Sequence, residues 1–147
     1  MSIRTAARAV IVEDGRLLTT ENERNGDRWY LTPGGGQYPG ETLHETLRRE
    51  VSEEVGIDIS VGPLLAVQEF IPENHGHEGR QQTNFLFRCE RIKGEVQSAN
   101  TDDPHQVGCQ WLRVTDLERE AFYPRKLASL LTAEENEKTP VYLGDTR

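Results

Sequence analysis

The sequence has little of several residue types, and each shortage excludes a class of protein. Only two of its 147 residues are cysteine, Cys89 and Cys109, and their separation fits no metal-ligand spacing. We therefore expect both thiols to be reduced and buried in the core, where cysteine is usually found. No hydrophobic run approaches the roughly 20 residues that a membrane helix needs. The first 15 residues also lack the apolar segment of a secretory signal. These absences predict a cytoplasmic protein with no membrane partner.

Basic residues are scarce relative to acidic ones. The chain has 17 lysines and arginines against 25 aspartates and glutamates, which gives a formal net charge of −8. Binding to a nucleic-acid backbone needs a basic surface, so we expect no nucleic-acid polymer as a partner. A small phosphorylated ligand is still compatible with this charge, because a bound divalent cation can reverse the local field.

The pattern along the chain predicts one layered domain of strands and helices. Residues 7–22 indicate a hairpin that turns at Asp14 and Gly15, and residues 42–55 indicate a helix. Further strands are expected at 28–31, 58–71, 82–92 and 106–114, and one or two helical segments within 115–136. We expect a break in the second of these strands near Gly62 and Pro63. This order predicts an α/β or α+β domain over residues 1–135, with a tail at 136–147 that is either an edge strand or disordered.

The expected helix at 42–55 begins and ends with clear signals. Thr42 can act as its N-cap, with Glu45 three residues later completing a capping box. Gly56 suits the left-handed residue that ends many helices. At about 100° per residue, Leu47 and Val51 fall on one buried stripe. The helix is therefore expected to pack one face against the core.

Three glutamates of this helix lie along the margin of that stripe rather than on its opposite face. They are Glu50, Glu53 and Glu54. A carboxylate at the edge of a core must be paired, protonated or bound to a metal. Helix geometry alone leaves two interpretations open: surface ion pairs with arginines, or a site for Mg²⁺, which prefers oxygen ligands.

A run of glycines precedes the helix and adds to the second interpretation. Gly34, Gly35 and Gly36 permit a close approach of the backbone to another group. Their amides and carbonyls are expected near the start of the helix, where a cation or a phosphate can be held. A flexible loop is the alternative explanation for such a run.

Residues 35–57 together resemble the signature of the Nudix family. That signature is a glycine, five residues, a glutamate, seven residues, and then Arg-Glu-apolar-x-Glu-Glu-x-Gly-apolar. Its fixed positions are occupied here by Gly35, Glu41, Arg49, Glu50, Val51, Glu53, Glu54, Gly56 and Ile57. The resemblance implies an α/β fold, a Nudix-type α/β/α sandwich in which a mixed β-sheet lies between helices. It also implies an enzyme that hydrolyses a diphosphate linkage in a nucleoside diphosphate derivative.

The resemblance further implies a role for each signature residue. Mg²⁺, or Mn²⁺ as a substitute, would be held by glutamate side chains and a glycine carbonyl. The ligands implied are Glu50, Glu54, Glu53, Gly34 and Gly35. Arg49 would orient a catalytic glutamate, and Glu53 would act as the general base. Glu41 would hold the ligating residues in position without binding the metal itself. In this family the base sometimes comes from a later loop, which here offers Glu95, Asp102, Asp103 and His105.

Residues that could contact the substrate are less strongly marked. Arg28 and Arg80 can bind phosphate, Trp29 can stack on a base, and His105 lies in the loop that follows residue 94. A packing or solvated role competes for each of them. The family resemblance favours ADP-ribose or a nucleotide sugar as substrate. The alternatives are a (deoxy)nucleoside triphosphate or dinucleotide polyphosphate, or a nucleotide-binding regulatory domain without turnover. A homodimer is suggested by analogy only.

Overall fold

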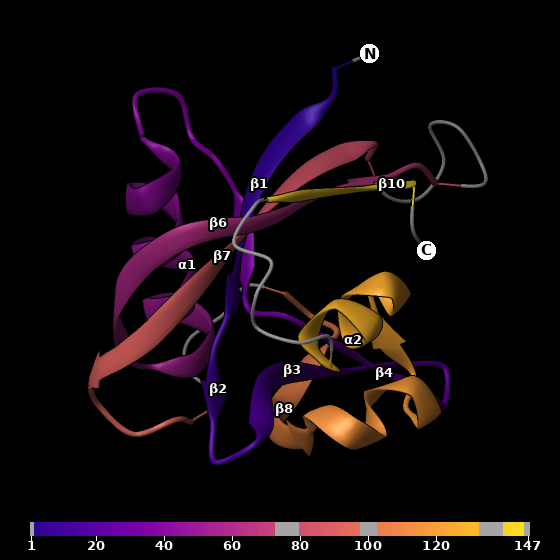
Figure 1. Cartoon of the computed structure of the whole chain (residues 1–147). Coiled ribbons are helices and arrows are strands. Elements are labelled where there is room, and N and C mark those ends of the chain that lie inside the picture. The colour runs from indigo at the N-terminus through magenta and orange to yellow at the C-terminus, as the bar shows by residue number, and fades with distance from the viewer. Residues whose placement is uncertain (1, 73–79, 98–102, 133–139, 146–147) are drawn as a thin grey trace.

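The first of two β-sheets contains the glycine run Gly34–Gly36. The structure is a computed structural model that describes residues 2–72, 80–97, 103–132 and 140–145. In spatial order the sheet contains β10 (Val141–Asp145), β6 (Asp58–Phe70), β7 (Gln82–Lys93), β1 (Arg4–Val10) and β5 (Gly34–Gly36) (Figure 1). The β10–β6 and β7–β1 pairs are parallel, and the β6–β7 and β1–β5 pairs are antiparallel. The sheet is therefore mixed.

The second sheet is built on the predicted hairpin. Its strands are β2 (Val12–Glu13), β3 (Arg16–Arg24), β4 (Asp27–Leu31), β8 (Gln106–Arg113) and β9 (Phe122–Tyr123). Asp14 and Gly15 connect β2 to β3 with φ values of 50° and 74°. Two consecutive residues in the left-handed region give the twist that matches a hairpin, which confirms the predicted turn.

The principal helix, α1, runs from Leu43 to Val55 and has the predicted ends. Thr42 and Glu45 form the reciprocal hydrogen bonds of a capping box, and Gly56 ends the helix with φ of 75°. A 3₁₀ helix, η1 (Val114–Arg119), and a second α-helix, α2 (Arg125–Thr132), follow β8. No helix among the described residues is long and apolar enough to cross a membrane.

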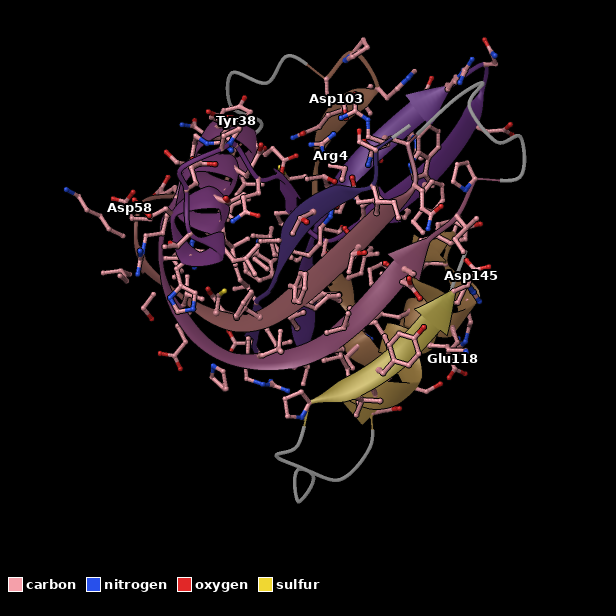
Figure 2. All side chains as sticks on the ribbon, turned by 90° about the horizontal axis from the view of Figure 1, so that it is seen from above. Arg4, Tyr38, Asp58, Asp103, Glu118 and Asp145 are labelled. Atoms are coloured by element: carbon pink, nitrogen blue, oxygen red, sulfur yellow. The ribbon has the colours of Figure 1, made fainter. Side chains whose placement is uncertain are left out.

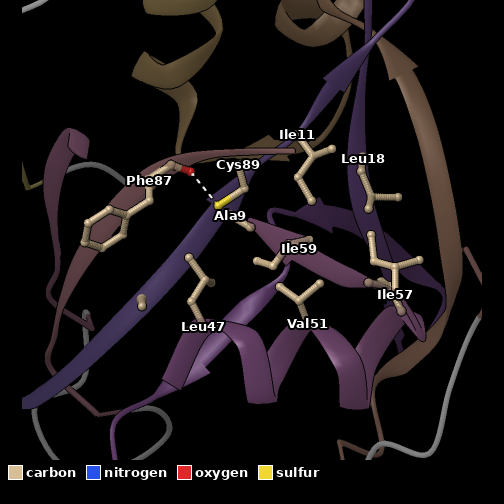
Figure 3. Close-up of a cluster of buried hydrophobic side chains, with 11 residues drawn as sticks. Ala9, Ile11, Leu18, Leu47, Val51, Ile57, Ile59, Phe87 and Cys89 are labelled. Carbon is tan, nitrogen blue, oxygen red and sulfur yellow. Dashed lines mark hydrogen bonds between the residues drawn. The ribbon is translucent and has the colours of Figure 1, made fainter. Parts of the chain in front are cut away.

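Two hydrophobic clusters lie on opposite faces of the first sheet. On one face, Leu47 and Val51 of α1 pack with Ala9 of β1 (Figure 3). On the other face, Leu127 of α2 packs with Val10, the next residue of β1. Each fully buried aliphatic side chain contributes roughly 1.5–3 kcal/mol. The first sheet thus lies between α1 and α2, which confirms the predicted α/β/α sandwich.

The glycine run differs from its simplest expectation. Gly34–Gly36 is a short strand that pairs with β1, not a flexible loop. At Gly34, φ is 146° and an added Cβ would lie 2.1 Å from the carbonyl oxygen of Ala7. The backbones approach so closely that only glycine fits there. This contact fixes the run against the sheet, beside the start of α1.

Other expectations need smaller corrections. β6 continues through Gly62 and Pro63, and the predicted break is a shift of pairing register between Val61 and Leu64. Cys89 is buried as expected, but Cys109 is only partly buried; both are free thiols. Residues 141–145 add β10 as an outer strand beside β6.

Candidate active site

Arg49 joins the glycine strand to α1 through several hydrogen bonds. Its Nε and Nη2 donate to the two carboxylate oxygens of Glu41 at 2.8 and 2.9 Å, and Nη2 also donates to the Gly36 carbonyl at 3.0 Å. These Arg49 donors hold the pKa of the Glu41 carboxyl at about 2, with help from the Tyr38 N–H. The Tyr38 ring stacks on the guanidinium at 3.9 Å. Glu41 and Tyr38 therefore fix the position of Arg49.

The remaining donor of Arg49 faces the acidic cluster of α1. Its Nη1 donates to Glu50 Oε1 at 2.9 Å and lies 3.5 Å from Glu53 Oε2. The Glu50 side chain is 14% exposed, whereas that of Glu53 is 48% exposed. Glu50 thus lies at the margin of the core as the helix pattern predicts, and Glu53 lies further out, open to solvent.

Glu54 has the most unusual environment of the three glutamates. Its Oε2 accepts a hydrogen bond of 2.7 Å from the Gly34 N–H. The pKa of the Glu54 carboxyl is raised to about 7, mainly by burial and also by the nearby carboxylates of Glu50 and Asp103. The Arg8 guanidinium and the Gly34 N–H oppose this shift but do not cancel it. Glu54 is therefore a buried carboxylate whose negative charge is only partly offset by the positive groups around it.

Gly35 is a second position at which the strand beside α1 needs glycine. A Cβ on Gly35 would lie 2.5 Å from the Glu50 carboxyl carbon and 2.7 Å from each carboxylate oxygen. The absent side chain therefore leaves the space that the Glu50 carboxyl group occupies. Gly35 and Glu50 act as a pair in shaping the site.

The donor set is suited to a hard divalent cation, although it is not assembled around one. Within the described ranges, no three acidic, histidine or cysteine side chains are grouped closely enough to hold a metal. Arg49 and the Gly34 N–H engage Glu50 and Glu54, and the Gly34 carbonyl accepts from Arg8 at 3.2 Å. All these ligand atoms are oxygens, which Mg²⁺ prefers. A bound cation would also offset the repulsion between the Glu50 and Glu54 carboxylates. The predicted ligands fit the ion chemically, and the metal assignment stays a prediction.

A cavity of about 800 Å³ opens between the first sheet and β4, and Glu50, Glu53 and Glu54 are not among its lining residues. Arg28, Trp29 and Arg80, which the sequence suggested as substrate contacts, all line it. Arg28 is held by Glu21 at 3.0 Å and Glu23 at 2.8 Å. His105 does not line the cavity, but its ring centre lies 6.1 Å from that of Trp29.

Arg8 connects the cavity to the glutamates, and sequence reasoning missed it. Its Nη1 donates to the carbonyls of Thr32 and Gly34, each at 3.2 Å. Burial lowers the pKa of Arg8, whereas the Glu54 carboxylate raises it. The available signal was a cation flanked by two small apolar residues, Ala7 and Ala9, within a strand. Three carboxamide residues of the cavity wall, Gln68, Gln82 and Asn84, were missed as well.

The loop before β8 brings one of its acidic residues toward the site. The Asp103 carboxylate acts electrostatically on both Arg8 and Glu54. Its Oδ1 accepts from the His105 N–H at 2.9 Å. Figure 2 shows Asp103, Arg4 and Tyr38 along one side of the molecule. Among the other loop candidates, Glu95 is exposed and Asp102 lies outside the described residues.

Comparisons with known proteins match most of the chain. A model of the NUDIX domain matches residues 3–131. The chain is 28% identical over 115 residues to the uncharacterized Nudix hydrolase YvcI of Bacillus subtilis. This alignment covers 78% of this chain and 69% of that protein. It is 32% identical over 106 residues to the human 8-oxo-dGDP phosphatase NUDT18, covering 71% of this chain but only 30% of that protein.

The structure also resembles a solved protein over almost its whole length. It aligns with the crystal structure of a MutT NUDIX hydrolase from Burkholderia pseudomallei with a TM-score of 0.75. The alignment covers 91% of this chain and all of the other, at 24% sequence identity. This likeness bears on the fold alone.

Proposed function

The chain belongs to the NUDIX domain family, and on that premise we propose that it hydrolyses the diphosphate linkage of a nucleotide with the help of Mg²⁺. The predicted family, fold and hydrolase class are confirmed by the match to residues 3–131 and by the structural likeness. The observation that supports this reaction best is the Arg49 network, in which one guanidinium contacts both Glu50 and Glu53, while the adjacent glycine strand contacts Glu54.

The reaction needs a base, a positioned diphosphate and neutralised charge. A water oxygen bonds to one phosphorus, the bridging oxygen leaves with the bonding electron pair, and a base takes the proton of the water. Bound Mg²⁺ would neutralise phosphate oxygens and lower the pKa of water, held by Glu50 and Glu54 with Glu53 and the carbonyls of Gly34 or Gly35. The side chain of Arg8, between this cluster and the cavity, would bind a phosphate oxygen.

Two residues compete for the role of base. Glu53 is half-exposed on α1 and is contacted by Arg49 at 3.5 Å, so it can receive a proton and release it to solvent. Asp103 is exposed and close enough to affect Arg8 and Glu54 electrostatically. We favour Glu53, because Arg49 fixes its position on a helix rather than on a loop.

The cavity favours a nucleoside carrying a second group on its diphosphate, such as ADP-ribose or a nucleotide sugar. A cavity of about 800 Å³ is of the size that encloses a whole small-molecule ligand. Trp29, Phe70 and Tyr123 supply aromatic surface for a base or sugar, and Arg80 supplies positive charge. A nucleoside diphosphate with an oxidised base is the second candidate, because NUDT18 is named an 8-oxo-dGDP phosphatase.

A substrate panel tests the proposal. ADP-ribose, a UDP-sugar, dGTP, a diadenosine polyphosphate and 8-oxo-dGDP are each incubated with Mg²⁺, and the products are separated by anion-exchange chromatography. Glu53→Gln should lower kcat by about 10²- to 10⁴-fold, the usual contribution of a general base. Asp103→Asn should lower it by much less, and Glu90→Gln, at an exposed position of β7, should leave it unchanged.

Three outcomes would contradict parts of this proposal. If Asp103→Asn loses as much activity as we expect of Glu53→Gln, the base is on the loop. If the wild type prefers dGTP or the dinucleotide by kcat/KM, the substrate class is wrong. Tight nucleotide binding with no cleavage of any diphosphate would mean a binding domain without turnover.

A further inference from the structure

Three carboxamide side chains form a continuous row of hydrogen bonds along one wall of the cavity. Gln82 Nε2 donates to Asn84 Oδ1 at 2.8 Å, and Asn84 Nδ2 donates to Gln68 Oε1 at 2.7 Å. Gln68 Nε2 then donates to the backbone carbonyl of Glu69 at 2.8 Å. Gln68 and Asn84 are 4% and 6% exposed, whereas Gln82, at the outer end, is partly exposed.

The orientation of every amide in this row is fixed from both ends. Arg8 Nε donates to Asn84 Oδ1 at 3.4 Å, and a guanidinium can only donate, so an oxygen must face it. At the other end, the Glu69 carbonyl can only accept, so the Gln68 nitrogen must face it. Turning any one amide by 180° would place two donors or two acceptors against each other, which is unfavourable for polar groups that lie out of contact with water.

This fixed direction leaves the carbonyl oxygen of Gln82 as the acceptor at the outer end of the row. Its nitrogen donates one of its two hydrogens to Asn84 Oδ1, and within the described ranges no donor reaches its Oε1. Arg4 lies opposite Gln82 in the β1–β7 register. The Arg4 guanidinium, however, lies over Gly36 on β5, on the far side of β1 from β7. The row therefore presents a hydrogen-bond acceptor to the cavity.

We infer that Gln82 Oε1 accepts a hydrogen bond from the exocyclic amino group of the substrate's base, so that the cavity prefers adenine and cytosine to hypoxanthine and uracil. This inference rests on the proposed function, in which the cavity holds the nucleoside. An amino group projects from the edge of the ring and can reach an acceptor on the wall. In the keto bases a carbonyl oxygen takes that position, and it repels Gln82 Oε1.

Equilibrium binding of matched nucleotide pairs tests this preference. Dissociation constants of ADP against IDP and of CDP against UDP are measured by calorimetry without added metal, so that no turnover intervenes. We expect the wild type to bind the amino member about fivefold to tenfold more tightly, as one neutral hydrogen bond permits. Gln82→Met should bring both ratios near one, because it weakens binding of the amino member and removes the repulsion of the keto member.

A neighbouring glutamine provides the matched control. Gln81 precedes Gln82 in the chain but does not line the cavity. Gln81→Met should therefore keep the wild-type ratios. Melting temperatures of both variants show whether they fold, and kcat/KM for the ADP-ribose and IDP-ribose pair provides a second measure of the same ratio.

The outcomes separate this inference from the proposed function. Wild-type ratios near one overturn the inference, even if Gln82→Met does not fold. A Gln82→Met variant that weakens both members of a pair equally also overturns it, because that result indicates a purely structural role. Absence of cleavage in the substrate panel overturns the proposed function, whereas the binding ratios still decide the base preference.

Discussion

Adding one methyl group at Gly35 should disable the enzyme without unfolding it. The backbone of Gly35 is outside the left-handed region, so alanine meets no conformational strain there. Its Cβ, however, would lie 2.5 Å from the Glu50 carboxyl carbon, about 0.9 Å short of the 3.4 Å at which ordinary contact begins. The Glu50 carboxylate must move by about that distance. A displacement of about 1 Å in a catalytic site can lower the rate about 100-fold.

The assay is kcat for the best substrate of the panel, measured beside the melting temperature of Gly35→Ala. A double-mutant cycle with Glu50→Asp isolates the contact, because the shorter side chain withdraws the carboxyl group from the new methyl group. We expect the double variant to be no less active than the worse of the two single variants. Full activity in Gly35→Ala, or losses that simply multiply in the double variant, would refute the reasoning.

Three other measurements test the surrounding structure. Leu47→Ala, at a side chain of α1 with no exposed surface, should lower the free energy of unfolding by about 2–5 kcal/mol in urea titrations; a loss below about 1 kcal/mol would contradict the packing of α1. Burial raises the pKa of the Cys89 thiol to about 12, so iodoacetamide should modify it at pH 8 only after denaturation, and fast labelling of the native protein would contradict its position. The pKa of Glu41 is held at about 2 by Arg49. Because this folded-state pKa is below the ordinary one, the interaction stabilises the fold fully above about pH 4.5 and is lost as the pH falls toward 2. Arg49→Met should therefore show a weaker dependence of Tm on pH in that window, and an unchanged slope would exclude the pair as its source.

The sequence predicted α1 and its acidic cluster well because the signals there are local. The capping box, the left-handed Gly56 and the buried stripe all depend on residues within one helix. The positions of Glu50 and Glu54 at the edge of the core follow from helix geometry alone. Glu53 lies further out, with a 48% exposed side chain, which the helix pattern did not predict.

The cavity could not be predicted in the same way, since its walls come from segments far apart in the chain. Arg8 belongs to β1, Asn84 to β7 and Gln68 to β6, and only the strand order places them together. The row of amides is a property of β6 and β7 being adjacent, with Gln68 paired to Asn84 in the antiparallel register. No spacing in the sequence carries that information.

Two short strands, β5 and β9, escaped prediction for a related reason. β5 is made of three glycines, which have low strand propensity, and it forms because β1 provides hydrogen-bonding partners. β9 has two residues, Phe122 and Tyr123, which pair with β4, and Tyr123 lines the cavity. Both strands therefore form because of contacts with other strands, and not because of the strand propensity of their own residues.

The most direct measurement is the rate of diphosphate cleavage against Mg²⁺ concentration for the wild type and Glu54→Gln. We expect the wild-type rate to rise with Mg²⁺, to saturate and to vanish with a chelator, and Glu54→Gln to lose most of the activity at every concentration while keeping its Tm. Equal rates with and without chelator, or a fully active Glu54→Gln, would contradict a metal-assisted reaction at the acidic edge of α1.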